Sequence, residues 1–282
     1  MTPGSGPDHV WSVPTAIVRE LAALSSAAVL FPLGIMSARD ADVLRLSAVP
    51  DATVREVTTT PVVLVHGYGG NRSNWLPLEA ALGRAGFANM YAMRYNPLVS
   101  DVPRIAARLL HDCRTVMTET GSNRVHVVAH SLGGVVLRHA ATVLGLGTWL
   151  DVGMTVATPH AGAFVAWFGR GTVAAALRPG SRLLRTIDRA ECPGAVRWVS
   201  YWSNLDPVVR PWSAVLPGPA PRVVNVLVPE EGHLSILRSP VFLADVVRRL
   251  RFAEQRAARS GLRTASGRPR VDVEQSPAPD AA

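Results

Sequence analysis

Lysine is absent from this chain, so all 29 of its basic side chains are arginines. This absence excludes Schiff-base chemistry on a lysine, a serine–lysine dyad and a phosphate-binding loop that depends on a lysine. Only two cysteines are present, Cys113 and Cys192, and their spacing matches no metal-binding motif. Whether they pair depends on the fold, and two separate thiols are the favoured interpretation.

Acidic side chains are also few, 21 against the 29 basic ones, and the net charge is +8. Such a charge can attract nucleic acid or an anionic membrane. However, Arg, Ala, Gly, Pro and Val are all abundant, as a GC-rich genome would produce, and much of the surplus lies in residues 248–270. We interpret the charge mainly as compositional bias and a solvated tail, and expect no nucleic-acid partner.

A long membrane-spanning run is lacking as well. Residues 21–36 are apolar but contain Pro32 and Gly34, and a spanning helix needs about 20 apolar residues. The charged stretch at residues 37–40 offers no clean signal-peptide cleavage site. The pattern favours a helix at about residues 17–36 that packs on the body or lies at a membrane surface. Location therefore stays open between membrane-associated or secreted through this segment and cytoplasmic.

Strand-like and helix-like segments alternate along most of the chain. A short run of β-branched residues and leucine predicts a strand over residues 61–65, and further strands are predicted over residues 89–95, 125–129, 152–157, 196–202 and 223–228. Helical periodicity predicts helices over residues 78–85, 103–120, 135–144 and 241–257. This alternation is typical of an α/β fold with a doubly wound, mostly parallel sheet and helices on both faces.

The same pattern suggests how the chain is organised. Residues 1–58 form an N-terminal segment that we expect to be partly disordered, and residues 40–60 read as a connection. Residues 59–257 form the α/β domain, and the polar residues 258–282 form a disordered tail. Residues 161–197 interrupt the alternation with glycines and short helical pieces, which predicts a small helical cap or lid.

Ser131 lies in the most informative segment of the sequence. The predicted strand 125–129 leads into Ala-His-Ser-Leu-Gly at residues 129–133, and an apolar helix follows. This is the strand–turn–helix context of a nucleophile elbow, usually written G-x-S-x-G, with alanine here replacing the first glycine. The alternative interpretation is a serine that only caps the helix.

A serine nucleophile needs a base, and the base needs an orienting carboxylate. The predicted strand 196–202 ends close to Asp206, and the predicted strand 223–228 ends close to His233. In a parallel sheet, groups beyond the carboxyl ends of the strands gather at one edge. Ser131, Asp206 and His233 are therefore predicted to converge as a catalytic triad.

Other titratable residues compete for these roles. His160 also follows a strand, but its place at a proline turn favours a structural role. His130 is expected to point away along the turn, and His66 to brace its own loop by hydrogen bonding. Glu230 and Glu231 could replace the aspartate, although both lie within the loop of the predicted base.

The loop His-Gly-Tyr-Gly-Gly at residues 66–70 supplies candidate oxyanion donors. Small residues let backbone N–H groups turn into a cleft, where each preorganised donor contributes roughly 3–4 kcal/mol. The amides of Tyr68 and of Leu132, which follows the serine, are the predicted pair. The alternatives are a plain glycine-rich turn or a phosphate cradle, and the missing lysine and missing G-x-G-x-x-G spacing count against the cradle.

Taken together, HGYGG, AHSLGG, ATPHAG, SNLDPVV and EGHLSIL resemble the α/β-hydrolase lipases, over about residues 61–250. The likeness is to bacterial triacylglycerol lipases and esterases with an A-x-S-x-G elbow, such as the Bacillus lipase group. The resemblance implies Ser131, Asp206 and His233 as the triad and the amides of Tyr68 and Leu132 as the oxyanion hole. It also implies that neither a cofactor nor a metal is required.

The sequence thus predicts a carboxylic ester hydrolase, in first place a lipase acting on a lipid or other apolar ester. A short-chain esterase, a thioesterase or a phospholipase on the same triad remains open, as does a non-catalytic binding or membrane-associated module; a haloperoxidase or dehalogenase is a weaker option. Phe164, Trp167 and Phe168 are candidates for a partial cover over the acyl pocket, with packing in the core as the equal alternative.

Overall fold

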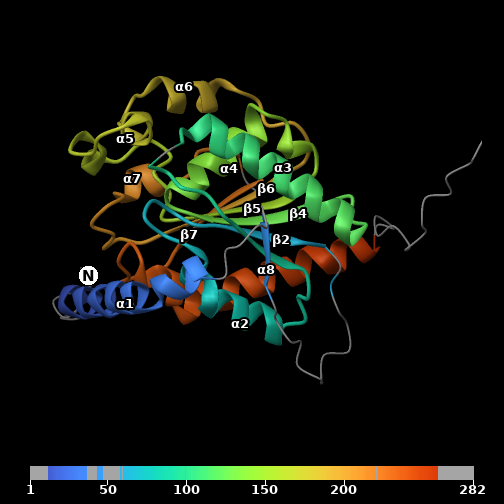
Figure 1. Cartoon of the computed structure of the whole chain (residues 1–282), viewed down its shortest axis with the longest axis horizontal. Coiled ribbons are helices and arrows are strands. Elements are labelled where there is room, and N and C mark those ends of the chain that lie inside the picture. Colours follow the sequence, from blue (N-terminus) through green and yellow to red (C-terminus); the bar gives the residue numbers. More distant parts are fainter. Residues whose placement is uncertain are drawn as a thin grey trace, which may run out of the picture.

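A seven-stranded sheet organises the chain, with strand order β1-β3-β2-β4-β5-β6-β7 (Figure 1). The computed structural model describes residues 12–36, 43–46, 58, 60–98, 100–219 and 222–259. The strands are β1 Val43–Leu46, β2 Val62–Val65, β3 Met90–Met93, β4 Val125–His130, β5 Leu150–Val156, β6 Arg197–Trp202 and β7 Val223–Leu227. All neighbouring strands pair in parallel except β1 and β3, which are antiparallel.

Helices cover both faces of this sheet, as the alternation predicted. They are α1 Ser12–Met36, α2 Leu76–Arg84, α3 Val102–Thr120, α4 Leu132–Thr142, α5 Thr172–Leu177, α6 Arg182–Arg189, α7 Pro211–Ala214 and α8 Pro240–Arg259. Short 3₁₀ turns are η2 Arg72–Trp75, η3 Leu146–Thr148, η4 Phe164–Trp167 and η5 Ser235–Arg238. Figure 1 shows α3 and α4 on one side of the sheet and α2 and α8 on the other.

The two faces bury two separate apolar clusters. One joins β2, β4 and the inner sides of α3 and α4, and includes Leu109 and Val136. The other joins the opposite face of the sheet to α2 and α8, and includes Met154 and Phe242. Burial on both faces explains why the central strands read as continuous apolar runs rather than as alternating patterns.

Local sequence also sets where the helices begin and end. In α3, the Asp101 side chain accepts a hydrogen bond from the amide of Arg104 at 2.9 Å, which satisfies one of the free donors of the first turn. The helix ends at Gly121, whose φ of 65° is the left-handed conformation that glycine adopts without strain. Helical spacing then brings Ile105, Leu109 and Val116 into the core.

The first strand was not predicted. Residues 40–60 were expected to be a connection, but β1 pairs with β3 and buries Leu46 almost completely. That prediction is wrong because a four-residue edge strand with an arginine in it carries too little periodicity to stand out. The sheet therefore begins before residue 59.

Helix α1 packs on the body through small side chains. Ala16 and Ala23 are buried, whereas Ile17, Leu21 and Leu24 are more than half exposed. Within the described ranges, no helix combines the length and apolar character needed to cross a membrane. The packed helix expected at about residues 17–36 is thus present, and it begins earlier, at Ser12.

Two further expectations can be compared with the structure. Cys113 is buried and Cys192 half-buried, and both are free thiols. Helix α8 continues to Arg259, two residues beyond its predicted end. Residues 1–11 of the N-terminal segment that was expected to be partly disordered, and residues 260–282 of the expected disordered tail, lie outside the described residues.

Replacing Leu46 with alanine tests whether β1 belongs to the folded core. Because this side chain is 1% exposed, we expect its truncation to lower the free energy of unfolding by about 2–5 kcal/mol. Arg45→Ala, on the exposed neighbour in the same strand, is the matched control and should change it much less. Urea unfolding measures both; equal effects would contradict the packing of β1.

Candidate active site

Ser131 occupies a strained turn between β4 and α4. Its backbone has φ of 52° and ψ of −120°, a conformation that side-chain-bearing residues rarely adopt. The Ser131 amide donates to the Val156 carbonyl at 2.8 Å, which ties the turn to β5. Ser131 stands at the N-cap position, but its side chain makes no capping hydrogen bond. The interpretation of this serine as a simple helix cap is therefore wrong.

Close backbone approach explains the small residues around this turn. A Cβ atom on Gly133 would lie 2.5 Å from the carbonyl oxygen of Val65, and one on Gly134 would lie 2.0 Å from Oγ1 of Thr158. Ala129, at the position where the usual motif has glycine, is fully buried in β4. The methyl group is thus accommodated there, whereas the two glycines following the turn have no room for one.

Three side chains that are distant in sequence meet at this turn. The Ser131 hydroxyl lies 2.9 Å from Nε2 of His233, and Nδ1 of the same ring lies 2.9 Å from Oδ2 of Asp206. An ionised carboxylate only accepts hydrogen bonds, so Nδ1 carries the proton and Nε2 presents its lone pair to the hydroxyl. The predicted convergence of the three residues is found.

Backbone hydrogen bonds hold the carboxylate of Asp206 in place, in addition to its contact with the imidazole. Its other oxygen, Oδ1, accepts hydrogen bonds from the amides of Val208 at 2.8 Å and Val209 at 2.9 Å. Asp206 itself is buried, at 4% exposure. The competing acids lie elsewhere: Glu231 accepts from the Ser235 hydroxyl at 2.7 Å, and Glu230 is half-buried at a positive φ.

The loop that carries His233 is held from several sides. Nε2 of His130 donates to the His233 carbonyl at 2.9 Å, and the two rings lie 4.9 Å apart. Ser203, from the loop of the aspartate, donates to the Glu231 carbonyl at 2.7 Å. Burial lowers the pKa of His130 to about 3, so this ring is neutral at neutral pH. The expectation that His130 points away from the site is wrong.

His66 and His160, the other two histidines that were weighed against His233, make structural contacts, as predicted. Nδ1 of His66 lies 2.9 Å from the Gly67 carbonyl, and its ring stacks on Tyr95 with the centroids 4.2 Å apart. Burial lowers the pKa of His66 to about 4. His160 is buried between Thr155 and Ser200, with Nε2 3.1 and 3.2 Å from their hydroxyl oxygens. Burial also lowers the pKa of His160 well below its ordinary value.

Of the two predicted oxyanion donors, Leu132 follows Ser131 in the chain, and the loop of Tyr68 lies close to Ser131 in space. Leu132 is the first residue of α4, so its amide is one of those that helix geometry leaves without an intrahelical acceptor. The loop of Tyr68 approaches the turn closely, because a Cβ on Gly67 would lie 2.9 Å from Cβ of Ser131. The Tyr68 side chain is half-exposed. Their role as donors remains a prediction.

The predicted cover residues lie on the surface. Phe164, Trp167 and Phe168 are 59%, 55% and 91% exposed, so packing in the core is wrong for them. They belong to η4 and its C-cap, in the segment that follows the carboxyl end of β5. Phe164 contacts Trp212 edge to face at 5.9 Å, and the Arg178 guanidinium lies 5.0 Å from the Trp167 ring centre. Their role as a cover stays a prediction.

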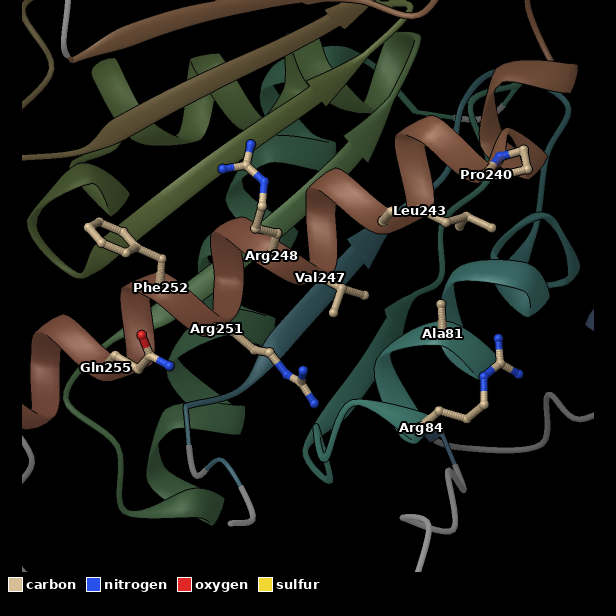
Figure 2. A pocket seen from close by; sticks show the side chains of 10 residues that line it. Ala81, Arg84, Pro240, Leu243, Val247, Arg248, Arg251, Phe252 and Gln255 are labelled. Carbon is tan, nitrogen blue, oxygen red and sulfur yellow. The ribbon is translucent and has the colours of Figure 1, made fainter. Parts of the chain in front are cut away.

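Two surface hollows lie away from Ser131. A groove of about 740 Å³ lies between α2 and α8. In Figure 2, Ala81 and Arg84 on α2 lie across from Val247 and Arg251 on α8. A second hollow, of about 270 Å³, lies between α1 and the loop that follows His233. In the part of the chain that the structure describes, no group of three or more His, Cys, Asp or Glu side chains could hold a metal ion.

Comparison with known proteins agrees with this geometry. Residues 62–188, which include the elbow at Ser131, match the model of the alpha/beta hydrolase family, and β6 and β7 continue the same sheet beyond that range. The chain thus has the alpha/beta hydrolase fold. A curated relative, a triacylglycerol lipase of Burkholderia plantarii, is 28% identical over 156 residues, which cover 51% of this chain and 43% of the relative. The chain therefore spans less than half the length of that relative.

Solved structures show the same fold. A Bacillus licheniformis lipase, BlEst2 in its mature form, superposes with a TM-score of 0.59 at 18% identity, covering 74% of this chain and 97% of that one. Aspergillus fumigatus lipase B has a TM-score of 0.57 at 15% identity, over 73% and 55% of the two chains. The phospholipase PlaB of Legionella pneumophila has a TM-score of 0.55 at 17% identity, over 72% and 63%.

The buried neutral histidines predict how stability depends on pH. His66, His130 and His160 have lowered pKa values in the folded state, whereas in the unfolded chain they titrate near 6.5. Their contribution is present above pH 6.5 and is lost as pH falls, by about 1.4 kcal/mol per pH unit for each proton bound on unfolding.

Urea unfolding between pH 7 and pH 5 measures this slope. The variant His160→Gln should show a shallower slope by about one proton. A free energy of unfolding that stays constant over this range would contradict the burial of these rings.

Proposed function

We propose that this protein is a serine carboxylester hydrolase that cleaves lipid esters. The hydrogen-bonded series Ser131, His233 and Asp206, with both distances at 2.9 Å, is the observation that carries the proposal. A serine, a base and an orienting acid in this order can form and hydrolyse an acyl-enzyme without a cofactor. The named lipases and the phospholipase among similar proteins support the same class of reaction.

The proposed reaction begins at Ser131 and passes through an acyl-enzyme. As Oγ of Ser131 attacks the acyl carbon, Nε2 of His233 takes the hydroxyl proton, and Asp206 stabilises the resulting imidazolium. The amides of Tyr68 and Leu132 receive the negative charge on the former carbonyl oxygen. The imidazolium then gives its proton to the leaving alcohol. Water, activated by the same ring, cleaves the acyl-serine and returns the hydroxyl to its starting state.

An apolar acyl group is the substrate feature that the surroundings favour. Exposed aromatic residues follow the carboxyl end of β5, next to the strand that leads into the elbow: Phe164, Trp167 and Phe168, with Trp212 beside them. Such residues can shield an acyl chain from water. We propose that they form part of a cover at the entrance to the site.

Labelling with an alkyl fluorophosphonate tests the reaction most simply. The wild-type chain should be labelled on one serine and should hydrolyse p-nitrophenyl esters. Ser131→Ala should lose labelling and at least about 10³-fold in kcat. Ser25→Ala, an exposed serine on α1, is the control and should behave as wild type. An unlabelled, inactive wild-type chain would favour a non-catalytic binding module. Activity confined to acetate and butyrate esters would favour a short-chain esterase.

We also propose that α1 lies on a lipid surface, which would make the protein membrane-associated. Its outer side is apolar, because Ile17, Leu21, Leu24 and Val29 are each more than half exposed. The only charged residues in this helix are Arg19 and Glu20. Both make polar contacts with the body, which leaves the outer side without an unpaired charge. A helix of this kind binds at the boundary between headgroups and acyl chains rather than across a bilayer.

Sedimentation with phospholipid vesicles tests this contact. Leu21→Ser combined with Leu24→Ser should weaken binding by about tenfold or more, since each buried leucine contributes about 1.5–3 kcal/mol. Val143→Ser, which alters an exposed apolar residue at the end of α4, is the matched control. Equal binding by both variants would contradict a role for α1.

A further inference from the structure

Glu20, on α1, reaches the backbone next to the proposed catalytic histidine. Its carboxylate accepts hydrogen bonds from the amide of Leu234, with Oε1 at 2.9 Å and Oε2 at 3.0 Å. It also accepts from the amide of Ser235, at 2.8 Å. These contacts join residues more than 200 positions apart in the chain, and the amides belong to the two residues that follow His233.

The peptide unit between His233 and Leu234 is thereby held at both ends. His130 donates to its carbonyl oxygen at 2.9 Å, and Glu20 accepts from its N–H at 2.9 Å. A peptide unit is planar, so fixing both polar groups fixes its orientation. The Cα of His233 is part of this peptide plane. The orientation of the plane therefore helps to set the direction in which the imidazole of His233 extends from the backbone.

Glu20 also acts as the missing N-terminal cap of the 3₁₀ turn η5. The 3₁₀ turn η5 begins at Ser235, and its N-cap residue, Leu234, has no side-chain oxygen to accept from the first amides. The carboxylate of Glu20 takes that place from a distant helix. Hydrogen bonds from N–H groups to a carboxylate are about twice as strong as those between neutral groups.

Around this contact, the described part of α1 packs through small side chains. Its inner side contributes alanines, Ala16 and Ala23, and a hollow of about 270 Å³ lies along the contact. The Arg19–Glu231 ion pair is 3.4 Å long with its arginine half-exposed. Gly232 leaves no room for a side chain next to Glu20, because a Cβ on it would lie 2.3 Å from Oε2 of the carboxylate.

We propose that Glu20 is a positioning residue for His233, which makes helix α1 a working part of the active site. The inference rests on the proposed function. Glu20 contacts no reacting atom; it sets the backbone from which the general base extends. Its loss therefore lowers the rate of the chemical step while leaving the acyl pocket and substrate binding in place.

Three variants of the full chain test this role. Glu20→Ala should lower kcat for a p-nitrophenyl ester by about 10- to 100-fold with little change in KM, because the proton transfer is misaligned. Glu20→Gln keeps one acceptor oxygen and should fall between Glu20→Ala and wild type. Ser25→Ala, on the same helix and exposed, should match wild type. The rate of phosphonate labelling at Ser131 should follow the same order.

Hydrogen exchange gives a readout that does not depend on activity. In Glu20→Ala the amides of Leu234 and Ser235 should exchange about tenfold faster or more, since both lose their acceptor. Exchange in the strands of the sheet should stay unchanged, which excludes general unfolding. Unchanged exchange at these two amides overturns the proposal, as does an unchanged kcat in an active enzyme.

Gly232→Ala approaches the same contact from the other side. Its new methyl group would displace the carboxylate, so it should lower kcat much as Glu20→Ala does. In the double variant the carboxylate is absent, and the second substitution should add little to the first. Fully additive effects would overturn the proposal. A wild-type chain that is neither labelled nor active would overturn the proposed function instead, and hydrogen exchange would still decide whether Glu20 holds this loop.

Discussion

The hydrogen bond between His233 and Ser131 joins residues 102 positions apart. The surrounding loops hold the two side chains within hydrogen-bond distance. Neither side chain lies on a regular element: the serine sits on a turn with a positive φ, and the histidine on a loop after β7. Parallel strands bring both loops to one edge of the sheet. The elbow glycines let helix α4 approach β2, and Asp206 is locked by two backbone amides before it meets the imidazole.

Much of this could be predicted from the sequence because the signals are local. Strand β4, which leads to the elbow, is buried on both faces and reads as a short apolar run. The Asp206 loop follows β6, and the His233 loop follows the partly buried edge strand β7, whose valines still mark it as a strand. Order along the chain then follows from the rule that functional groups lie beyond the carboxyl ends of parallel strands. Ser131, Asp206 and His233 could therefore be named without coordinates.

The features that were missed depend on contacts between distant segments. Strand β1 is only four residues long, and its pairing with β3 leaves no periodic signal. The contact of Glu20 with Leu234 depends on how α1 docks, which no local pattern encodes. His130 is the last residue of β4, directly before Ser131, and its ring turns toward the His233 backbone because the loops meet there. Arg19 and Glu20, a charged pair in an otherwise uncharged helix, are the sequence feature that points to polar contacts of this helix.

A crystal structure of the protein after reaction with an alkyl phosphonate tests the central claim most directly. The account predicts that phosphorus is bonded to Oγ of Ser131, with one phosphoryl oxygen about 2.7–3.1 Å from the amides of Tyr68 and Leu132. The imidazole of His233 would remain between the adduct and Asp206. An adduct on another residue, or a phosphoryl oxygen directed away from both amides, would contradict it.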